Sequence, residues 1–212
     1  MGRQWGSATF SWPVSLTHRE LTLRPLGRRD RKAWAEVREA NRSWLGPWEA
    51  TLPPGSSRGP GSFGGLIRVL DHQAREGRML PWAVCWDDGD GVRLGGQLTV
   101  SNIVAGSMSG AQIGYWIDER LAGRGIIPLA VALATDHCFT QLGLHRMEIA
   151  IRPENAKSLR VVEKLGFRAE GLRPKYLHID GDWRDHLIFA LNSDEVGDGL
   201  VARWESTRPI AG

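Results

Sequence analysis

The fold of this chain is decided by residues 111–125, which read AQIGYWIDERLAGRG. Residues 111–117 have the apolar and aromatic composition of a strand, and Gly123 and Gly125 close the segment. The apolar stretch 126–142 follows at once and predicts a long helix. Pro128 falls in the first turn of that helix, where a missing N–H group does least harm. The segment therefore predicts a strand, a glycine-rich turn and a helix in direct succession.

A glycine-rich turn between a strand and a helix suits an anionic ligand. Gly123 and Gly125 let the backbone approach the ligand closely, and the free N–H groups at the start of the helix then face it. Arg120 and Arg124 add full positive charge. The pattern Arg-x-x-Gly-x-Gly is neither a Walker loop nor a dinucleotide fingerprint. A turn that simply reverses the chain is the competing interpretation.

The residues on either side predict a mixed α/β sheet around one core. Before the turn, strands are expected at 20–25, 82–86 and 93–103, and helices at 29–41 and 66–76. After the long helix, the pattern predicts a strand at 147–151, a helix at 156–165 and strands at 167–176 and 182–191. The strand 111–117, the long helix and the strand 147–151 form a β-α-β crossover, which joins parallel strands. The earlier strands follow one another as antiparallel neighbours.

Two connecting segments have unusual compositions. Residues 43–48 read SWLGPW and predict an aromatic turn. Of residues 53–65, eleven of thirteen are Gly, Pro or Ser, which predicts a loop.

Size and composition point to one globular domain. The chain has 212 residues, of which 42% are hydrophobic and 24% charged, and these values exclude a wholly disordered protein. We expect a domain at 18–192, an N-terminal segment at 1–17 that packs on it, and a C-terminal tail or short helix at 193–212.

The sequence argues against a membrane, secreted or metal-binding protein. No apolar run reaches the roughly 18 residues of a membrane span, and the start of the chain lacks the apolar core of a secretory signal. We therefore expect a cytoplasmic protein. Cys85 and Cys138 are too few for a disulfide framework or a four-cysteine zinc site. The net charge of +3 comes from dispersed Lys and Arg, so direct DNA binding is not expected.

A second motif makes the chemistry specific. Residues 152–167 read RPENAKSLRVVEKLGF, which places Asn155-x-x-Ser158 at the start of a short helix that ends in Glu-Lys-Leu-Gly-Phe. Together with the Arg-x-x-Gly-x-Gly turn, this motif resembles the GNAT superfamily of acyl-CoA-dependent N-acetyltransferases over about residues 20–191. Residues 175–186, KYLHIDGDWRDH, resemble the RimJ-type branch, the ribosomal-protein alanine N-acetyltransferases.

The resemblance implies a GNAT fold, with flanking helices on a mixed central sheet of about seven strands. Its central strands, 111–117 and 147–151, would splay apart and leave a slot. It implies acetyl-CoA as co-substrate and no metal. The acceptor would be the N-terminal α-amine of a protein, such as a ribosomal protein that starts with Ala or Ser. The resemblance implies no membrane partner, and the protein would be a monomer or a homodimer.

The same resemblance places the coenzyme. Backbone N–H groups of residues 120–125 would hold the pyrophosphate, and the end of the preceding strand would pair with the pantetheine amides. Asn155 would bond the pantetheine, although it is also a good N-cap for the helix that starts at residue 156, and the two roles can coexist. The implied coenzyme-binding residues are Ile117, Arg120, Gly123, Arg124, Gly125, Asn155 and Ser158.

Two hydroxyls are candidates for protonating the leaving thiolate. Ser158 lies one helical turn after Asn155 on the same face, and Tyr176 is the second candidate. No single base is evident. The related RimL type has a glutamate after its penultimate strand, whereas residues 175–179 contain no carboxylate. Glu39, Tyr176, His178, Asp180 and a water chain remain open as alternatives. An α-amine, with a pKa near 7.7–8.0, is already about one-tenth neutral at pH 7.

The acceptor groove is expected between residues 41–48 and 175–183. The candidate acceptor-binding residues are Glu39, Trp44, Trp48, Tyr115 and His178, although core packing explains the aromatic ones equally well. Two other functions stay open, namely acetylation of a small amine such as an antibiotic or a polyamine, and a catalytically silent acyl-CoA-binding module.

Overall fold

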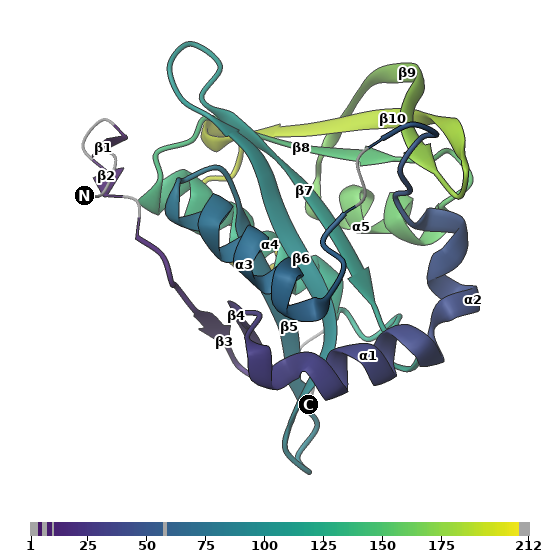
Figure 1. Cartoon of the computed structure of the whole chain (residues 1–212). Coiled ribbons are helices and arrows are strands. Elements are labelled where there is room, and N and C mark those ends of the chain that lie inside the picture. The colour runs from purple at the N-terminus through teal and green to yellow at the C-terminus, as the bar shows by residue number, and fades with distance from the viewer. Residues whose placement is uncertain (1–3, 6–7, 10, 57–58, 208–212) are drawn as a thin grey trace.

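An eight-stranded sheet forms the centre of the molecule, and helices cover both of its faces (Figure 1). The computed structural model describes residues 4–5, 8–9, 11–56 and 59–207. Every neighbouring pair in the sheet is antiparallel except β7–β8, which confirms the expected mixed sheet. The strands, in sheet order, are β3 (Leu16–His18), β4 (Leu21–Pro25), β5 (Leu80–Asp87), β6 (Val92–Val104), β7 (Gly110–Ile117), β8 (Arg146–Ile151), β10 (Asp182–Asn192) and β9 (Arg168–Ile179).

The strand beyond those expected is β3, which pairs with β4 through three residues and is too short to show an alternating pattern. Of the expected N-terminal segment 1–17, residues 1–3, 6–7 and 10 lie outside the described residues. Within it, β1 (Gln4–Trp5) and β2 (Ala8–Thr9) form a separate pair. The Trp12 indole donates to Asp71 across 3.1 Å, so part of this segment packs on the body.

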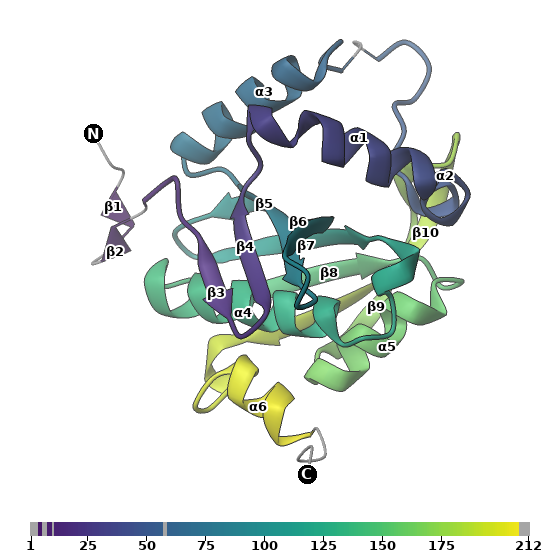
Figure 2. The same ribbon diagram turned by 90° about the horizontal axis from the view of Figure 1, so that it is seen from below.

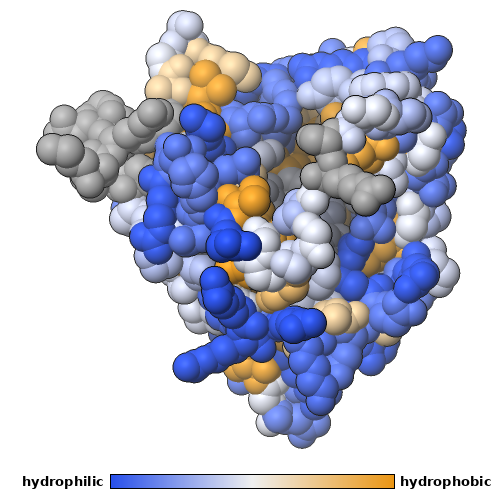
Figure 3. Space-filling view, in the orientation of Figure 1, coloured by the Kyte–Doolittle hydropathy of each residue, from blue (hydrophilic) through white to orange (hydrophobic). Residues whose placement is uncertain are grey.

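Two layers of helices sandwich the sheet (Figure 2). On one face lie α1 (Arg31–Ala40), α2 (Arg42–Leu45) and α3 (Phe63–Arg75), and on the other lie α4 (Ile126–Gln141), α5 (Ala156–Leu165) and α6 (Leu200–Ser206). Short 3-10 turns are η1 (Arg28–Asp30), η2 (Gly46–Trp48), η3 (Glu119–Leu121) and η4 (Ser193–Glu195). The outer surface of the α1–α3 layer is mostly hydrophilic, with apolar residues between the polar ones (Figure 3).

Two local predictions were wrong. Residues 43–48 are not an irregular turn, because they belong to α2 and η2, where Leu45 N–H bonds the Asn41 carbonyl at 2.9 Å. The second helix starts at Phe63 rather than residue 66. The Ser62 side chain accepts from Gly65 N–H at 3.1 Å and caps the helix there.

The core lies mainly between the sheet and α4. Most residues of α4 are buried, because the sheet, α5 and α6 surround it. Asp136 of α4 fixes α6 by accepting from Leu200 N–H at 2.6 Å and from Val201 N–H at 2.9 Å. Among the described residues, no helix is both long enough and apolar enough to cross a membrane.

The two central strands separate, as expected. The strands β7 and β8 pair at Gly110–Arg146, Ala111–Met147 and Gln112–Glu148, and then diverge (Figure 1). On the other side of β7, Asp118 N–H donates to Gly95 of β6 at 2.7 Å. Successive residues of a strand point their backbone groups to opposite sides, so those of Tyr115 and Ile117 face the gap. The gap therefore has an open strand edge along β7.

Candidate active site

The glycine turn directly joins β7 to α4. Gly123 has a φ of +81° and Gly125 a φ of +82°, a left-handed conformation that other residues rarely adopt. Gly125 is the N-cap of the 16-residue helix α4, and its carbonyl accepts from Leu129 N–H at 3.2 Å. The N–H groups of Ile126 and Ile127 belong to the first turn and have no carbonyl within the helix to bond. The turn can therefore receive an anion through backbone N–H groups.

The carboxylate of Asp118 shapes this turn. Asp118 is buried and accepts from the backbone N–H and the Nε of Arg120, both at 3.0 Å. Burial raises the pKa of Asp118, but hydrogen bonds from Arg120 and Asn41 lower it more, so the pKa lies below its ordinary value. Arg120 is thus neutralised locally, whereas Arg124 is exposed and has no ion pair within the described part of the chain. Arg124 is the better placed of the two expected arginines to offer charge.

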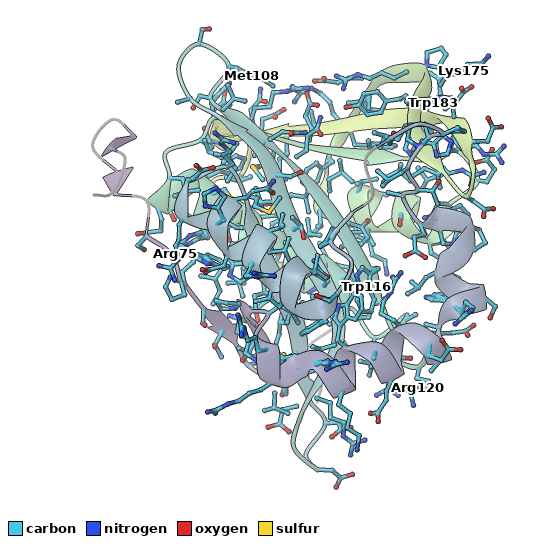
Figure 4. All side chains as sticks on the ribbon, in the orientation of Figure 1. Arg75, Met108, Trp116, Arg120, Lys175 and Trp183 are labelled. Carbon is cyan, nitrogen blue, oxygen red and sulfur yellow. The ribbon has the colours of Figure 1, made fainter. Side chains whose placement is uncertain are left out.

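Asn41, which the sequence suggested only as a helix terminator, holds the turn from the other side. It is 1% exposed at the end of α1. Its Nδ2 donates to the Val37 carbonyl and its Oδ1 accepts from Glu119 N–H, both at 2.8 Å. The end of α1 is therefore pinned to η3, close to Arg120 (Figure 4). An asparagine that ends a helix gives no sequence signal for such a distant partner.

Of the two tryptophans of the expected acceptor wall, Trp44 contacts both the end of β7 and α5, whereas Trp48 contacts Arg152 after β8. The Trp44 indole N–H donates to the Ile117 carbonyl at 3.0 Å, and Lys157 of α5 lies 3.7 Å from its ring centroid. The Trp48 ring stacks on Arg152 at 5.3 Å, and Arg152 donates to the Pro47 carbonyl at 2.6 Å. Trp44 therefore lies at the mouth of the gap.

Tyr115 and Ser158 lie near each other on the α4 side of the sheet. The Tyr115 hydroxyl is buried. Burial raises its pKa to about 12, and the nearby Ser158 hydroxyl lowers the pKa in part. No described residue forms a hydrogen bond with the Tyr115 oxygen. Asn155 Oδ1 accepts from Ser158 N–H at 3.1 Å, so its capping role is present in the fold.

Tyr176 lies on the opposite face of the sheet. Its hydroxyl accepts from Gln112 Nε2 and from Arg173, both at 3.1 Å, and its ring meets His186 edge-on at 5.9 Å. Gln112 and Tyr115 differ by an odd number of positions on β7 and therefore face opposite ways. No contact among the described residues joins Tyr176 to Ser158.

The remaining sequence candidates for acceptor binding are His178 and Glu39. His178 is buried, with Nδ1 2.8 Å from the Thr51 hydroxyl, and its ring meets Trp183 edge-on at 5.5 Å. Thr51 N–H also donates to the His178 carbonyl at 3.0 Å. Residues that follow η2 are therefore anchored on the β9–β10 hairpin, which brings the two expected groove segments together. Glu39 is exposed and pairs with Arg42.

Within the described part of the chain, none of the candidate bases is a buried carboxylate without a partner. Asp180 is exposed at the hairpin turn. Glu148 of β8, which no sequence motif marked, is 7% exposed and shares its face with Gln112. Two arginines compensate its charge, Arg146 at 2.8 Å and Arg173 at 3.6 Å. Its carboxylate is therefore already engaged by two guanidinium groups.

Comparison with known proteins agrees with this geometry. Residues 20–168 match the family described as acetyltransferase (GNAT) domain. The chain is 30% identical over 188 residues to the [ribosomal protein uS5]-alanine N-acetyltransferase of Escherichia coli (strain K12), which covers 88% of this chain and 94% of that enzyme. The structure of Mycobacterium smegmatis RimJ in complex with CoA-disulfide has a TM-score of 0.83 and 37% identity, covering 92% of this chain and 95% of that one.

Shorter matches involve other acetyltransferases. The spermidine N(1)-acetyltransferase of Escherichia coli (strain K12) is 33% identical over 69 residues, which is 32% of this chain and 37% of that enzyme. The chain spans 58% of the length of a further relative, to which it is 42% identical over 104 residues. The family match covers well over half of the chain and includes the glycine turn and α5. The chain therefore belongs to the acetyltransferase (GNAT) family and is an acyl-CoA-dependent N-acetyltransferase.

Proposed function

We propose that this chain transfers the acetyl group of acetyl-CoA to the N-terminal α-amine of a protein, such as a ribosomal protein that begins with Ala or Ser. The observation that carries the proposal is the continuity of two features. The open edge of β7 at Tyr115 and Ile117 leads directly into the glycine turn at Gly123 and Gly125. An extended ligand with amides at one end and a diphosphate at the other matches both.

In this proposal the diphosphate lies against the N–H groups of residues 120–125, with the charge of Arg124 beside it. The pantetheine amides bond the open edge of β7 near Ile117, and Asn155 contacts the same arm. Its N-cap bond uses only one lone pair of the amide oxygen, which leaves the side-chain NH₂ free to donate. The thioester then lies in the gap, between Tyr115 and Ser158 on one face and Tyr176 on the other.

The transfer forms a C–N bond between the acceptor amine and the acetyl carbon and breaks the C–S bond. The nitrogen loses a proton and the thiolate gains one. We assign the donation to Ser158, with Tyr176 as the alternative. The raised pKa of Tyr115 keeps its hydroxyl protonated near Ser158. No strong base is needed when the acceptor is an α-amine, because part of it is neutral near pH 7.

The related enzymes differ in the acceptor that their names give. The similarity to the uS5-alanine enzyme and to RimJ extends over most of the chain and supports a protein N-terminus. The shorter similarity to a spermidine acetyltransferase supports a polyamine as the second candidate. The basic side chains Arg146 and Arg173 around Glu148 weigh against a polycation.

Three acceptors test the proposal. One is a peptide with a free N-terminal Ala and no lysine, the second is the same peptide N-terminally blocked with one internal lysine, and the third is spermidine. Thiol release from acetyl-CoA is measured for each. We expect the highest kcat/KM for the free Ala peptide. A higher value for the blocked peptide or for spermidine would refute the protein N-terminus as the acceptor.

A further inference from the structure

Gly114 leaves an open space on one face of the sheet, in the middle of a central strand. It lies in the central strand β7, paired with Thr99 of β6, and yet it is exposed. Apart from its two chain neighbours, a Cβ built on Gly114 would meet no atom of the described residues within 4 Å, and its φ lies outside the left-handed region. The backbone conformation therefore does not require glycine here, and what glycine supplies is space.

The opening lies where the two central strands part. Gln112 is the last residue of β7 that pairs with β8, and Gly114 is two positions further on. Gly114 shares its face with Gln112 and Trp116, because side chains alternate along a strand. Gln112 Nε2 donates to the Tyr176 hydroxyl at 3.1 Å, and the Arg38 guanidinium lies 5.3 Å from the centroid of the Trp116 ring. Both flanking side chains are thus held away from the space above Gly114.

In the proposed function this face is the acceptor side. Trp116, labelled in Figure 4, packs with Trp34 and Val37 beneath α1, whereas Tyr115 packs in the core beneath α4. The backbone groups of Gly114 point to β6, so no amide of the coenzyme can pair with them. An incoming molecule can use Gly114 only through its open face.

We propose that Gly114 is the residue that admits the acceptor amine to the thioester and limits the size of the group next to that amine. This inference rests on the proposed function, because the thioester is placed in the gap beside Tyr115. The ligand class is a primary amine with a small neighbouring side chain, which passes between the Gln112–Tyr176 pair and the Trp116–Arg38 pair.

The experiment uses Gly114→Ala and Gly114→Val in the full chain. The matched control is Gly64→Ala in α3, where an added Cβ also meets no described atom beyond its chain neighbours and the backbone of its own helix, and where φ is ordinary. Acetyl-CoA affinity, thermal stability and kcat/KM are measured with peptides that begin with Gly, Ala and Leu.

Each added methyl should exclude larger acceptors first. In Gly114→Ala, kcat/KM should fall about tenfold for the Leu peptide and less for the Gly peptide. In Gly114→Val it should fall about a hundredfold or more for the Ala and Leu peptides. Acetyl-CoA affinity and thermal stability should stay at wild-type values, because a side chain at this point enters open space and β-branched residues suit strands.

Two results would overturn the inference. One is an unchanged order and size of kcat/KM in Gly114→Val, and the other is a parallel loss of acetyl-CoA affinity, which would place Gly114 in the coenzyme site. Failure of the proposed function is separate: wild type would then prefer spermidine to every peptide. In that case the same variants, measured with spermidine and with methylamine, decide the steric role by the same size order.

Discussion

The indole N–H of Trp44 donates a hydrogen bond to the carbonyl oxygen of Ile117 across 3.0 Å. That carbonyl belongs to the open edge of β7, which faces the gap between β7 and β8. In the proposed complex the pantetheine arm bonds the same edge. In that complex, Trp44 of the acceptor wall and the pantetheine arm would both bond the backbone near Ile117.

Trp44→Phe should separate these roles. The change removes the hydrogen bond and keeps a ring beside Lys157. We expect the unliganded protein to lose about 0.5–1.5 kcal/mol of stability, and CoA to bind about twofold to tenfold more tightly because it no longer competes with the indole. Adenosine 3′,5′-bisphosphate, which lacks the pantetheine arm, should bind equally to both proteins. Calorimetric titration with both ligands measures this.

Trp48→Phe is the control for Trp44, because Trp48 stacks on Arg152 and makes no bond to β7. CoA affinity that falls in Trp44→Phe would show that the indole supports the arm instead of competing with it.

A negative charge in the glycine turn should weaken the binding of acetyl-CoA. In Gly125→Asp, a carboxylate stands where the diphosphate is expected, and acetyl-CoA affinity should fall by at least about tenfold, equal to 1.4 kcal/mol. Gly125→Asn is the matched control, because asparagine tolerates the left-handed conformation at least as well as aspartate and carries no charge. Equal affinity for Gly125→Asp and wild type, or equal losses in both variants, would exclude the electrostatic explanation.

The proton donor should be revealed by turnover. Ser158→Ala should lower kcat by up to about 10²–10⁴-fold with a smaller effect on KM, because the hydroxyl acts on the leaving sulfur. Tyr176→Phe tests the alternative donor on the opposite face and should have the smaller effect. A reversed order would make Tyr176 the acid. Turnover within about twofold of wild type in both variants would remove both from that role.

The pH profile should follow the substrate amine. We expect kcat/KM for the free Ala peptide to rise up to about pH 8 and then level off, near the pKa of an α-amine. Tyr115 should cause no change in kcat/KM below about pH 10, because burial raises its pKa to about 12 and its hydroxyl stays protonated. A half-maximal pH near 6.5 would instead point to a histidine base.

Acid should weaken the attachment of α1 to the sheet. Asp30 accepts from Arg24 at 2.7 and 2.8 Å and from Gly27 N–H at 2.7 Å, and the bond from Arg24 is the main reason that its pKa is lowered. A lowered pKa in the folded state means that the stabilisation exists above the ordinary carboxyl pKa and disappears as pH falls through the lowered value. Asp30→Asn should therefore cost about 1–2 kcal/mol at pH 7.

Urea unfolding of wild type and Asp30→Asn at pH 7 and pH 3 measures this difference. The gap between the two proteins should narrow at pH 3. A gap that is the same at both pH values would attribute the loss to packing.

Local sequence determined the elements that carry the chemistry. The helix at Ala156–Leu165 has the predicted bounds, because Asn155 caps its start and Gly166, with a φ of +74°, ends it. The glycine turn before α4 was predictable for the same reason, since the conformation of Gly123 and Gly125 depends on the residues themselves. The family resemblance rested on motifs whose spacing lies within short segments, and the splay of the central strands was implied by that resemblance.

Tertiary structure alone decided which of these residues meet. Trp44 and Ile117 are 73 positions apart, and Asn41 and Glu119 are 78 apart, so no local pattern predicts either bond. The alternation of side chains along β7 predicts that Tyr115 and Gly114 face opposite ways. It does not predict that one faces a core and the other an open space. Which face becomes core depends on the helices that pack there, and that choice is made by hydrophobic burial over the whole chain.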